Sequence, residues 1–130
     1  MIQEIKFEHF PWDEMPWARN APGENRLKTN EAKPEFPVLI LWKNDRRVAY
    51  LCYYIFDAVN IVYAETHPDF VKRGYATELV DEVCRRYHRE FDIKAQSTCT
   101  DADASVRLLK RCGFERVTQG LTNWILRKGG

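Results

Sequence analysis

The run from Thr66 to Thr77, THPDFVKRGYAT, joins a segment rich in β-branched and aromatic residues to an amphipathic segment with helical spacing. A strand that stops before Pro68 and turns through a basic loop into a helix leaves backbone N–H groups without acceptors inside the helix. Those N–H groups and the positive end of the helix dipole together favour a phosphate. The sequence therefore predicts a strand, a phosphate-binding loop and a helix, in that order.

Strands are expected on the amino-terminal side of this loop. Apolar residues alternate or run continuously between polar turns, which is typical of an antiparallel meander. Phe10–Trp17, interrupted by prolines, predicts a helical turn, and Asn20–Pro37 predicts a long polar connector, either solvated or part of a functional site. The strands are expected at Ile2–Phe7, Pro37–Trp42, Arg47–Phe56 and Ile61–Thr66.

The segment after the loop has helical spacing. Its apolar residues form one stripe and its charged residues cover the remaining faces, so one side is expected to be buried. Arg85, Arg86 and Arg89 alternate with acids, which favours a solvated face over a nucleic-acid patch. A strand follows at Ile93–Cys99, then a helix from the acids Asp101 and Asp103 to Arg111, and a closing hairpin at Phe114–Thr118 and Leu121–Leu126.

Composition limits the classes of function. The chain has 130 residues, enough for one domain over residues 1–130, and its 20 basic and 19 acidic side chains give a formal net charge of +1. This balance gives no electrostatic reason to expect nucleic acid or a membrane surface as a partner. The amino terminus lacks a leader pattern and the longest apolar run is short, so a cytoplasmic location is expected. The four cysteines are widely spaced, so neither a metal site nor a disulfide framework is predicted.

Two motifs carry a resemblance to a known family. Val71-x-x-Gly74-x-Ala76 resembles the Q/R-x-x-G-x-G/A pyrophosphate motif of GNAT-type acyl-CoA N-acetyltransferases, with Val71 departing from the first position. The segment from Ser105 to Glu115 resembles the family's A-x-x-L-Y-x-x-x-G-F segment. The order of the predicted strands and helices is also similar to that of this family. The resemblance implies an α+β (α/β) GNAT fold, a mixed, mostly antiparallel sheet of about seven strands with helices on both faces.

The resemblance implies acetyl-CoA as co-substrate and no metal. Backbone amides of the loop would hold the diphosphate, Gly74 would allow close approach, and the pantetheine arm would lie along the end of the preceding strand. The residues implied in cofactor binding are Glu65, Thr66, Val71, Lys72, Arg73, Gly74, Tyr75, Ala76 and Thr77.

Catalytic residues are less clearly indicated, because the chain departs from the family. Leu109 stands where the family commonly has a Tyr that serves as general acid. Asn60 stands where histone acetyltransferases of the superfamily have a Glu that serves as general base. Ser97 occupies the place of a Glu in the bacterial N-terminal-alanine acetyltransferases. Glu65 is the acid nearest the expected thioester, but simple strand alternation places it on the opposite face from Asn60. The catalytic candidates are therefore Asn60, Ser97 and Glu65, and a nucleophilic role for Cys99 or Cys112 is disfavoured.

Two functions remain open from the sequence. The first is an acetyl-CoA-dependent N-acetyltransferase that transfers the acetyl group directly to a small amine, a protein N-terminus or a lysine, either as a monomer or as a homodimer. The second is a catalytically impaired GNAT-fold protein that binds acyl-CoA or serves as a protein-interaction or regulatory module. The departures at Leu109 and Asn60 are what favours the second function.

Overall fold

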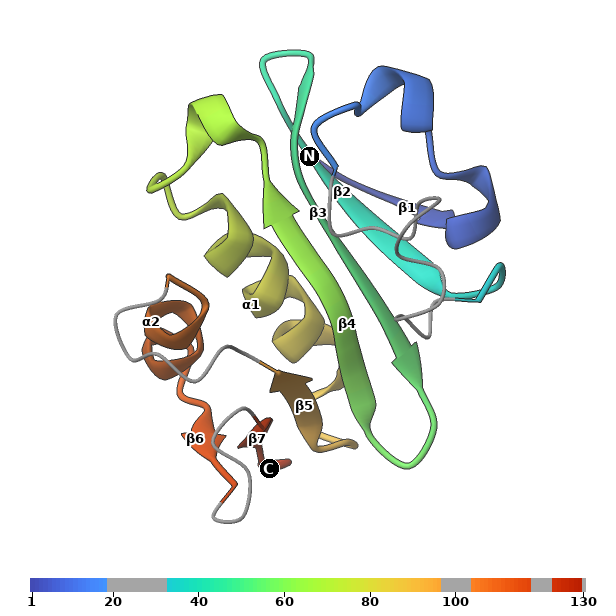
Figure 1. Cartoon of the computed structure of the whole chain (residues 1–130). Coiled ribbons are helices and arrows are strands. Elements are labelled where there is room, and N and C mark those ends of the chain that lie inside the picture. Colours follow the sequence, from blue (N-terminus) through green and yellow to red (C-terminus); the bar gives the residue numbers. More distant parts are fainter. Residues whose placement is uncertain (19–32, 97–103, 118–122, 130) are drawn as a thin grey trace.

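The computed structural model describes residues 1–18, 33–96, 104–117 and 123–129. Seven strands and two α-helices are found in these ranges (Figure 1). The strands are β1 Ile2–Lys6, β2 Pro37–Lys43, β3 Arg46–Ile55, β4 Val59–Thr66, β5 Ile93–Gln96, β6 Glu115–Arg116 and β7 Asn123–Leu126. The helices are α1 Tyr75–Tyr87 and α2 Ala104–Arg111, and three 3₁₀ turns are η1 Phe7–His9, η2 Trp12–Glu14 and η3 Pro68–Phe70.

The strands form one sheet in the order β1-β2-β3-β4-β5-β7-β6. Only the β4–β5 pair is parallel, and every other neighbouring pair is antiparallel. The parallel pair arises because the loop, η3 and α1 return the chain to the same end of the sheet before β5 begins. This arrangement confirms the predicted mixed, mostly antiparallel sheet.

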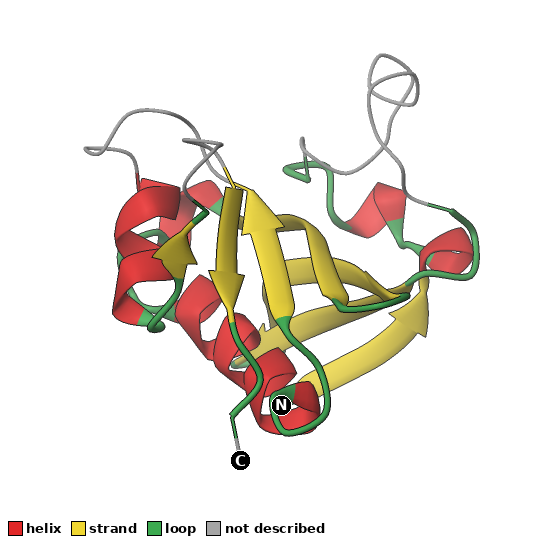
Figure 2. Cartoon of the chain, turned by 90° about the horizontal axis from the view of Figure 1, so that it is seen from below, coloured by secondary structure: helices red, strands yellow, loops and turns green. Residues whose placement is uncertain are grey.

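Two apolar clusters cover the two faces of the sheet. On one face, α1 and α2 bury residues such as Leu79, Val83 and Val106 against the sheet. On the other face, the chain around η1 and η2 buries Phe10 and Met15. Figure 2 shows both α-helices on one side of the sheet and the turns η1 and η2 on the opposite side. We call the second of these the turn face.

Helix α1 owes its orientation to its apolar stripe. Leu79, Val80 and Val83 are its buried residues, as the helical spacing in the sequence predicts. On its exposed side, Glu82 accepts hydrogen bonds from both Arg85 and Arg86. These bonds hold the pKa of the Glu82 carboxyl below its usual range. The arginines thus belong to an ion-paired helix face, which agrees with the interpretation preferred from the sequence.

Strand β4 contains one extra residue relative to its neighbour. Cys52 of β3 is opposite Tyr63, but the next residue, Tyr53, is opposite Ile61. Val62 therefore has no partner of its own in β3, which is the arrangement of a β-bulge. A bulge bends the strand and shifts the alternation of its side chains by one position.

Because of this bulge, the sequence-based prediction that Asn60 and Glu65 lie on opposite faces of the sheet is wrong. Asn60 is opposite Tyr54 and Glu65 is opposite Tyr50, and both tyrosines lie on the turn face. Residues that are opposite one another in an antiparallel pair project from the same face of the sheet. Asn60 and Glu65 therefore share the turn face, because the extra residue Val62 lies between them.

Among the described residues, no helix combines the length and the apolar character needed to cross a bilayer.

Candidate functional site

Strands β4 and β5 are paired over only a short distance. Their register contains two positions, Val59 with Ile93 and Asn60 with Lys94. Strand β4 continues to Thr66, so beyond Asn60 the edge of β4 that faces β5 has no strand partner in the described part of the chain. An unpaired strand edge presents a row of backbone donors and acceptors that a ligand can use as a further strand.

A cavity of about 510 Å³ occupies the opening between the two strands. Amides, two tyrosines and one lysine give it its polar groups, and no carboxylate or imidazole is among its described lining residues. We call it the splay cavity. It is lined by Tyr54, Asn60, Ile61, Val62, Tyr63, Lys94, Ala95, Gln96, Val117, Asn123 and Trp124.

The phosphate loop predicted from the sequence lies between η3 and α1. Lys72 and Gly74 both have left-handed backbone conformations, with φ of 66° and 81°. Gly74 is the N-cap of α1, and a Cβ added to it would meet no atom within 4 Å. The glycine is therefore required by its backbone angle and leaves open the space over the helix N-terminus, where a bound group would otherwise meet a side chain.

Backbone donors of the loop are available for a ligand. After Phe70, the next N–H of this segment that bonds to another backbone group in the described residues belongs to Glu78, which donates to the Gly74 carbonyl at 2.9 Å. Successive N–H groups around left-handed residues form a concave anion site, and the helix dipole adds partial positive charge. The loop thus has the features of the predicted phosphate site.

Basic side chains surround the same loop. The guanidinium carbon of Arg73 lies 5.4 Å from the centre of the Phe70 ring, and that of Arg46 lies 6.0 Å from it. Arg111 of α2 donates to the Thr77 hydroxyl at 3.3 Å. These contacts hold cationic groups from three segments near the N-terminus of α1, which favours an anionic ligand there.

Glu65 lies beside the cavity lining but is not part of it. Its carboxylate accepts a hydrogen bond from the Tyr50 hydroxyl at 3.1 Å, and Tyr50 is 1% exposed. Burial and the Glu65 carboxylate together raise the pKa of the Tyr50 phenol well above its usual value. Although Glu65 shares a face with Asn60, it is fixed by a buried partner outside the splay cavity.

The other sequence candidates lie in different places. Asn60 lines the splay cavity, and its amide donates to the Ala58 carbonyl at 3.0 Å. Ser97, like Cys99, lies outside the described residues. Leu109 is 4% exposed and belongs to the core between α2 and the sheet.

Several residues of the cavity were not found by sequence reasoning. The Gln96 amide donates to the Asn123 side-chain oxygen at 3.3 Å across the β5–β7 pair, and both residues line the cavity. Tyr54, which is opposite Asn60 in the β3–β4 pair, also lines this cavity. The available signal was alternation in β5, where Lys94 and Gln96 alternate with apolar residues.

A family model matches most of the chain. The acetyltransferase (GNAT) family model covers residues 4–114. The chain belongs to the acetyltransferase (GNAT) family. Its membership places it among acyltransferases and confirms the family expected from the two sequence motifs.

Solved structures share the fold. One is an IAA acetyltransferase from Bacillus cereus ATCC 14579, with a TM-score of 0.71 and 12% identity over 91% of this chain and 78% of the other. The ribosomal-protein-S18-alanine N-acetyltransferase from Escherichia coli has a TM-score of 0.68 and 14% identity over 100% and 97%. The Bacillus subtilis N-acetyltransferase YlbP, in complex with coenzyme A, has a TM-score of 0.68 and 14% identity over 98% and 95%. No curated protein matches the chain in sequence.

Proposed function

We propose that this chain is an acetyl-CoA-dependent N-acetyltransferase that transfers an acetyl group directly to an amine. The observation that carries the proposal is the open phosphate loop at the end of β4, next to the splay cavity. The loop directly follows the part of β4 that extends beyond its pairing with β5, and this order suits a ligand with a diphosphate at one end and amide groups behind it. The coenzyme A in the structure of the similar YlbP protein supports the same assignment.

The residues present fit acetyl-CoA. The loop would hold the diphosphate with the backbone N–H groups of residues 71–77, with charge from Lys72 and Arg73. The open space at Gly74 leaves room for that contact. The main chain of Glu65 and Thr66, beyond the last β4–β5 pair, would bond the amides of the pantetheine arm.

When bound, acetyl-CoA supplies an acetyl thioester, and the balanced reaction gives the N-acetylated amine and the free thiol of CoA. Backbone N–H groups of β4 beyond the last β4–β5 pair would provide donors where negative charge develops on oxygen. Asn60, Gln96 and Asn123 provide amides that can orient the amine and hold a water molecule. Because the described lining has no carboxylate or imidazole, we assign uptake of the amine's proton to water ordered by these amides.

Proton donation to the leaving thiol needs a group other than Leu109, which lies in the core. Tyr54 and Tyr63 are the hydroxyl-bearing residues of the described cavity lining. Tyr63 adjoins the bulge at Val62 and is the β4 residue of the lining that lies nearest the loop in sequence. We assign the donor role to Tyr63 and expect Tyr63→Phe to lower kcat by more than Tyr54→Phe.

The test combines binding with turnover. Calorimetry with acetyl-CoA measures occupation of the loop, and thiol release with a panel of amines and peptides, followed by mass spectrometry of the acetylated product, measures transfer. Binding with an acetylated product supports the proposal. Binding without product from any acceptor would instead favour a ligand-binding module, and no binding would exclude both.

A further inference from the structure

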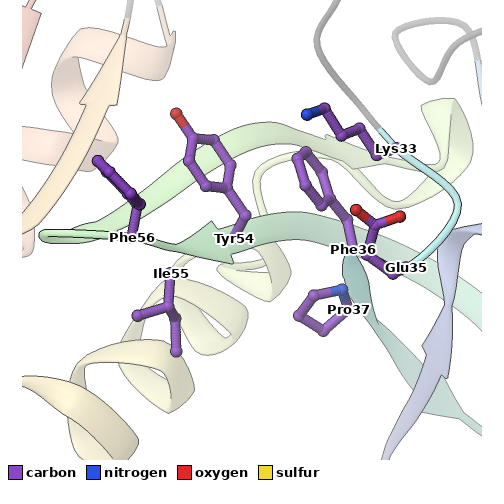
Figure 3. Close-up of a pocket in the computed structure, with 7 residues that line it drawn as sticks. All are labelled: Lys33, Glu35, Phe36, Pro37, Tyr54, Ile55 and Phe56. Atoms are coloured by element: carbon purple, nitrogen blue, oxygen red, sulfur yellow. The ribbon is translucent and has the colours of Figure 1, made fainter.

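A second cavity lies on the turn face, next to the splay cavity. It encloses about 630 Å³, and Figure 3 shows the side chains that surround it. We call it the aromatic cavity. It is lined by Lys33, Glu35, Phe36, Pro37, Tyr54, Ile55 and Phe56, which come from the segment before β2, the first residue of β2, the end of β3 and the residue after it.

Aromatic rings form the walls of this cavity. The Phe36 and Tyr54 rings are stacked, with their centres 4.8 Å apart and an interplanar angle of 18°. Phe56 is 83% exposed and Ile55 is 42% exposed. Figure 3 shows Tyr54 and Phe56 on the same side of β3, and Ile55 pointing the other way. An exposed phenylalanine beside a stacked aromatic pair is a surface that gains free energy when an apolar group covers it.

The charges of the aromatic cavity do not select a charged occupant. Lys33 and Glu35 contribute one charge of each sign at its rim, and the other lining residues are uncharged. The cavity therefore suits a neutral apolar group more than a second ammonium or an anion.

Tyr54 connects this cavity with the splay cavity, because it lines both. It lies opposite Asn60 of β4, whereas Phe36 directly precedes β2 on the other side of β3. From Asn60 to Phe36 the path crosses two strand spacings, which is roughly 10 Å. A molecule with its amine beside Asn60 can therefore place another part of itself against Phe36 and Phe56.

We propose that the acceptor is an amine bearing an apolar group, aromatic or branched aliphatic, roughly 10 Å from its nitrogen, and that this group binds between Phe36, Tyr54 and Phe56. The proposal rests on the proposed transferase function and names the substrate class of the same site. Two sources share this chemistry: a small arylalkylamine, and a polypeptide N-terminus whose third residue is apolar.

The experiment compares matched acceptors. The small-molecule arm uses benzylamine, phenethylamine, phenylbutylamine and phenylhexylamine, each beside the alkylamine that lacks the ring. The peptide arm compares a tripeptide ending in phenylalanine with the same tripeptide ending in alanine. Because an extended chain advances about 3.3 Å per residue, the third side chain reaches the aromatic cavity when the amine is in the splay cavity.

The ring should improve kcat/KM by roughly tenfold to a hundredfold in the best pair, the gain expected from burying an aromatic group. This gain should be greatest for phenylhexylamine or the peptide, and smallest for benzylamine. A larger gain in the peptide arm identifies polypeptides as the acceptors, and a larger gain in the amine arm identifies small amines.

Phe56 is the residue to change, because it is 83% exposed and its replacement leaves no cavity in the core. Phe56→Ser should reduce the ring's advantage by roughly tenfold, mainly through KM. Phe56→Leu should keep most of it. Asp57→Ala is the matched control, since Asp57 is exposed on the same hairpin but does not line the cavity, and it should leave the advantage unchanged.

A binding measurement separates failure of this proposal from failure of the transferase function. N-acetylphenylhexylamine, the product, is titrated calorimetrically against the native protein and the Phe56→Ser variant in the presence of CoA. Tighter binding than N-acetylhexylamine, lost in Phe56→Ser, supports the proposal even without turnover. Equal binding of the two products, or a ring advantage that Phe56→Ser leaves intact, would overturn it while leaving the transferase function standing.

Discussion

Replacing Gly74 with glutamate tests the phosphate loop while leaving the fold largely intact. The φ of 81° costs an L-residue about 1–2 kcal/mol. No atom lies within 4 Å of the new Cβ, and an acidic side chain at a helix N-terminus stabilises the helix by about 0.3–1 kcal/mol. The expected net loss is about 1 kcal/mol, which lowers the unfolding midpoint by about 3–5 °C in a domain of this size.

The effect of Gly74→Glu on acetyl-CoA affinity should be much larger. A carboxylate about 5 Å from a phosphate, at an effective dielectric constant of about 20, gives a repulsion of about 3 kcal/mol. This corresponds to roughly two orders of magnitude in Kd. The side chain also occupies the space that the diphosphate needs.

Calorimetry with acetyl-CoA and a thermal melt of the same sample measure both effects together. Gly113→Ala is the matched control, because Gly113 also has a left-handed φ, of 90°, but follows α2 away from the loop. It should lose a similar amount of stability and keep native affinity. Native affinity in Gly74→Glu would refute the assignment of the diphosphate to this loop.

Three further predictions concern Glu65, Leu109 and the ion pairs of Glu82. Glu65→Gln should lower kcat by less than the roughly hundredfold loss expected for a general base, because Glu65 bonds to Tyr50 outside the splay cavity; a larger loss that recovers at high pH would identify Glu65 as the base. Leu109→Tyr should lower the free energy of unfolding by about 1–3 kcal/mol through overpacking without raising kcat, since Leu109 is 4% exposed. Chemical denaturation measures the loss of stability and steady-state kinetics measures kcat, and a gain in kcat would contradict this prediction. The pKa of Glu82 is lowered in the folded state, so its stabilising contribution is complete above the unfolded pKa of about 4.5 and is lost as the pH falls through the folded value. The stability difference between the native protein and Glu82→Gln should therefore shrink in acid, and a difference that grew would reverse the assigned sign.

The order of elements could be predicted because apolar periodicity and turn residues are local signals. The pattern of α1 was sufficient to identify Leu79, Val80 and Val83 as its buried face, and the loop was evident from Gly74 beside a strand and a helix. These features depend on residues close together in the sequence, where spacing alone determines which side chains share a face.

The bulge at Val62 could not be predicted in the same way. Its position depends on the pairing of β4 with β3, and nothing in the local composition of β4 marks it. One extra residue reversed the face assigned to Glu65, which changed the predicted relation between two candidate residues. Predictions that rely on strand parity fail whenever a bulge intervenes.

The cavities could not be predicted because their walls come from distant segments. The splay cavity joins Tyr54 of β3 to Gln96 of β5 and Asn123 of β7, and the aromatic cavity joins Phe36 to Phe56. The register that brings these residues together is set by the whole sheet.

The most direct test of the account is the product of a reaction that contains the protein, acetyl-CoA and a panel of amines and peptides. We predict equal amounts of free CoA thiol and N-acetylated acceptor, with both lost in Gly74→Glu and retained in Gly113→Ala. Release of thiol without an acetylated amine, or acetyl-CoA binding with no product from any acceptor, would contradict the assignment of this chain as an N-acetyltransferase.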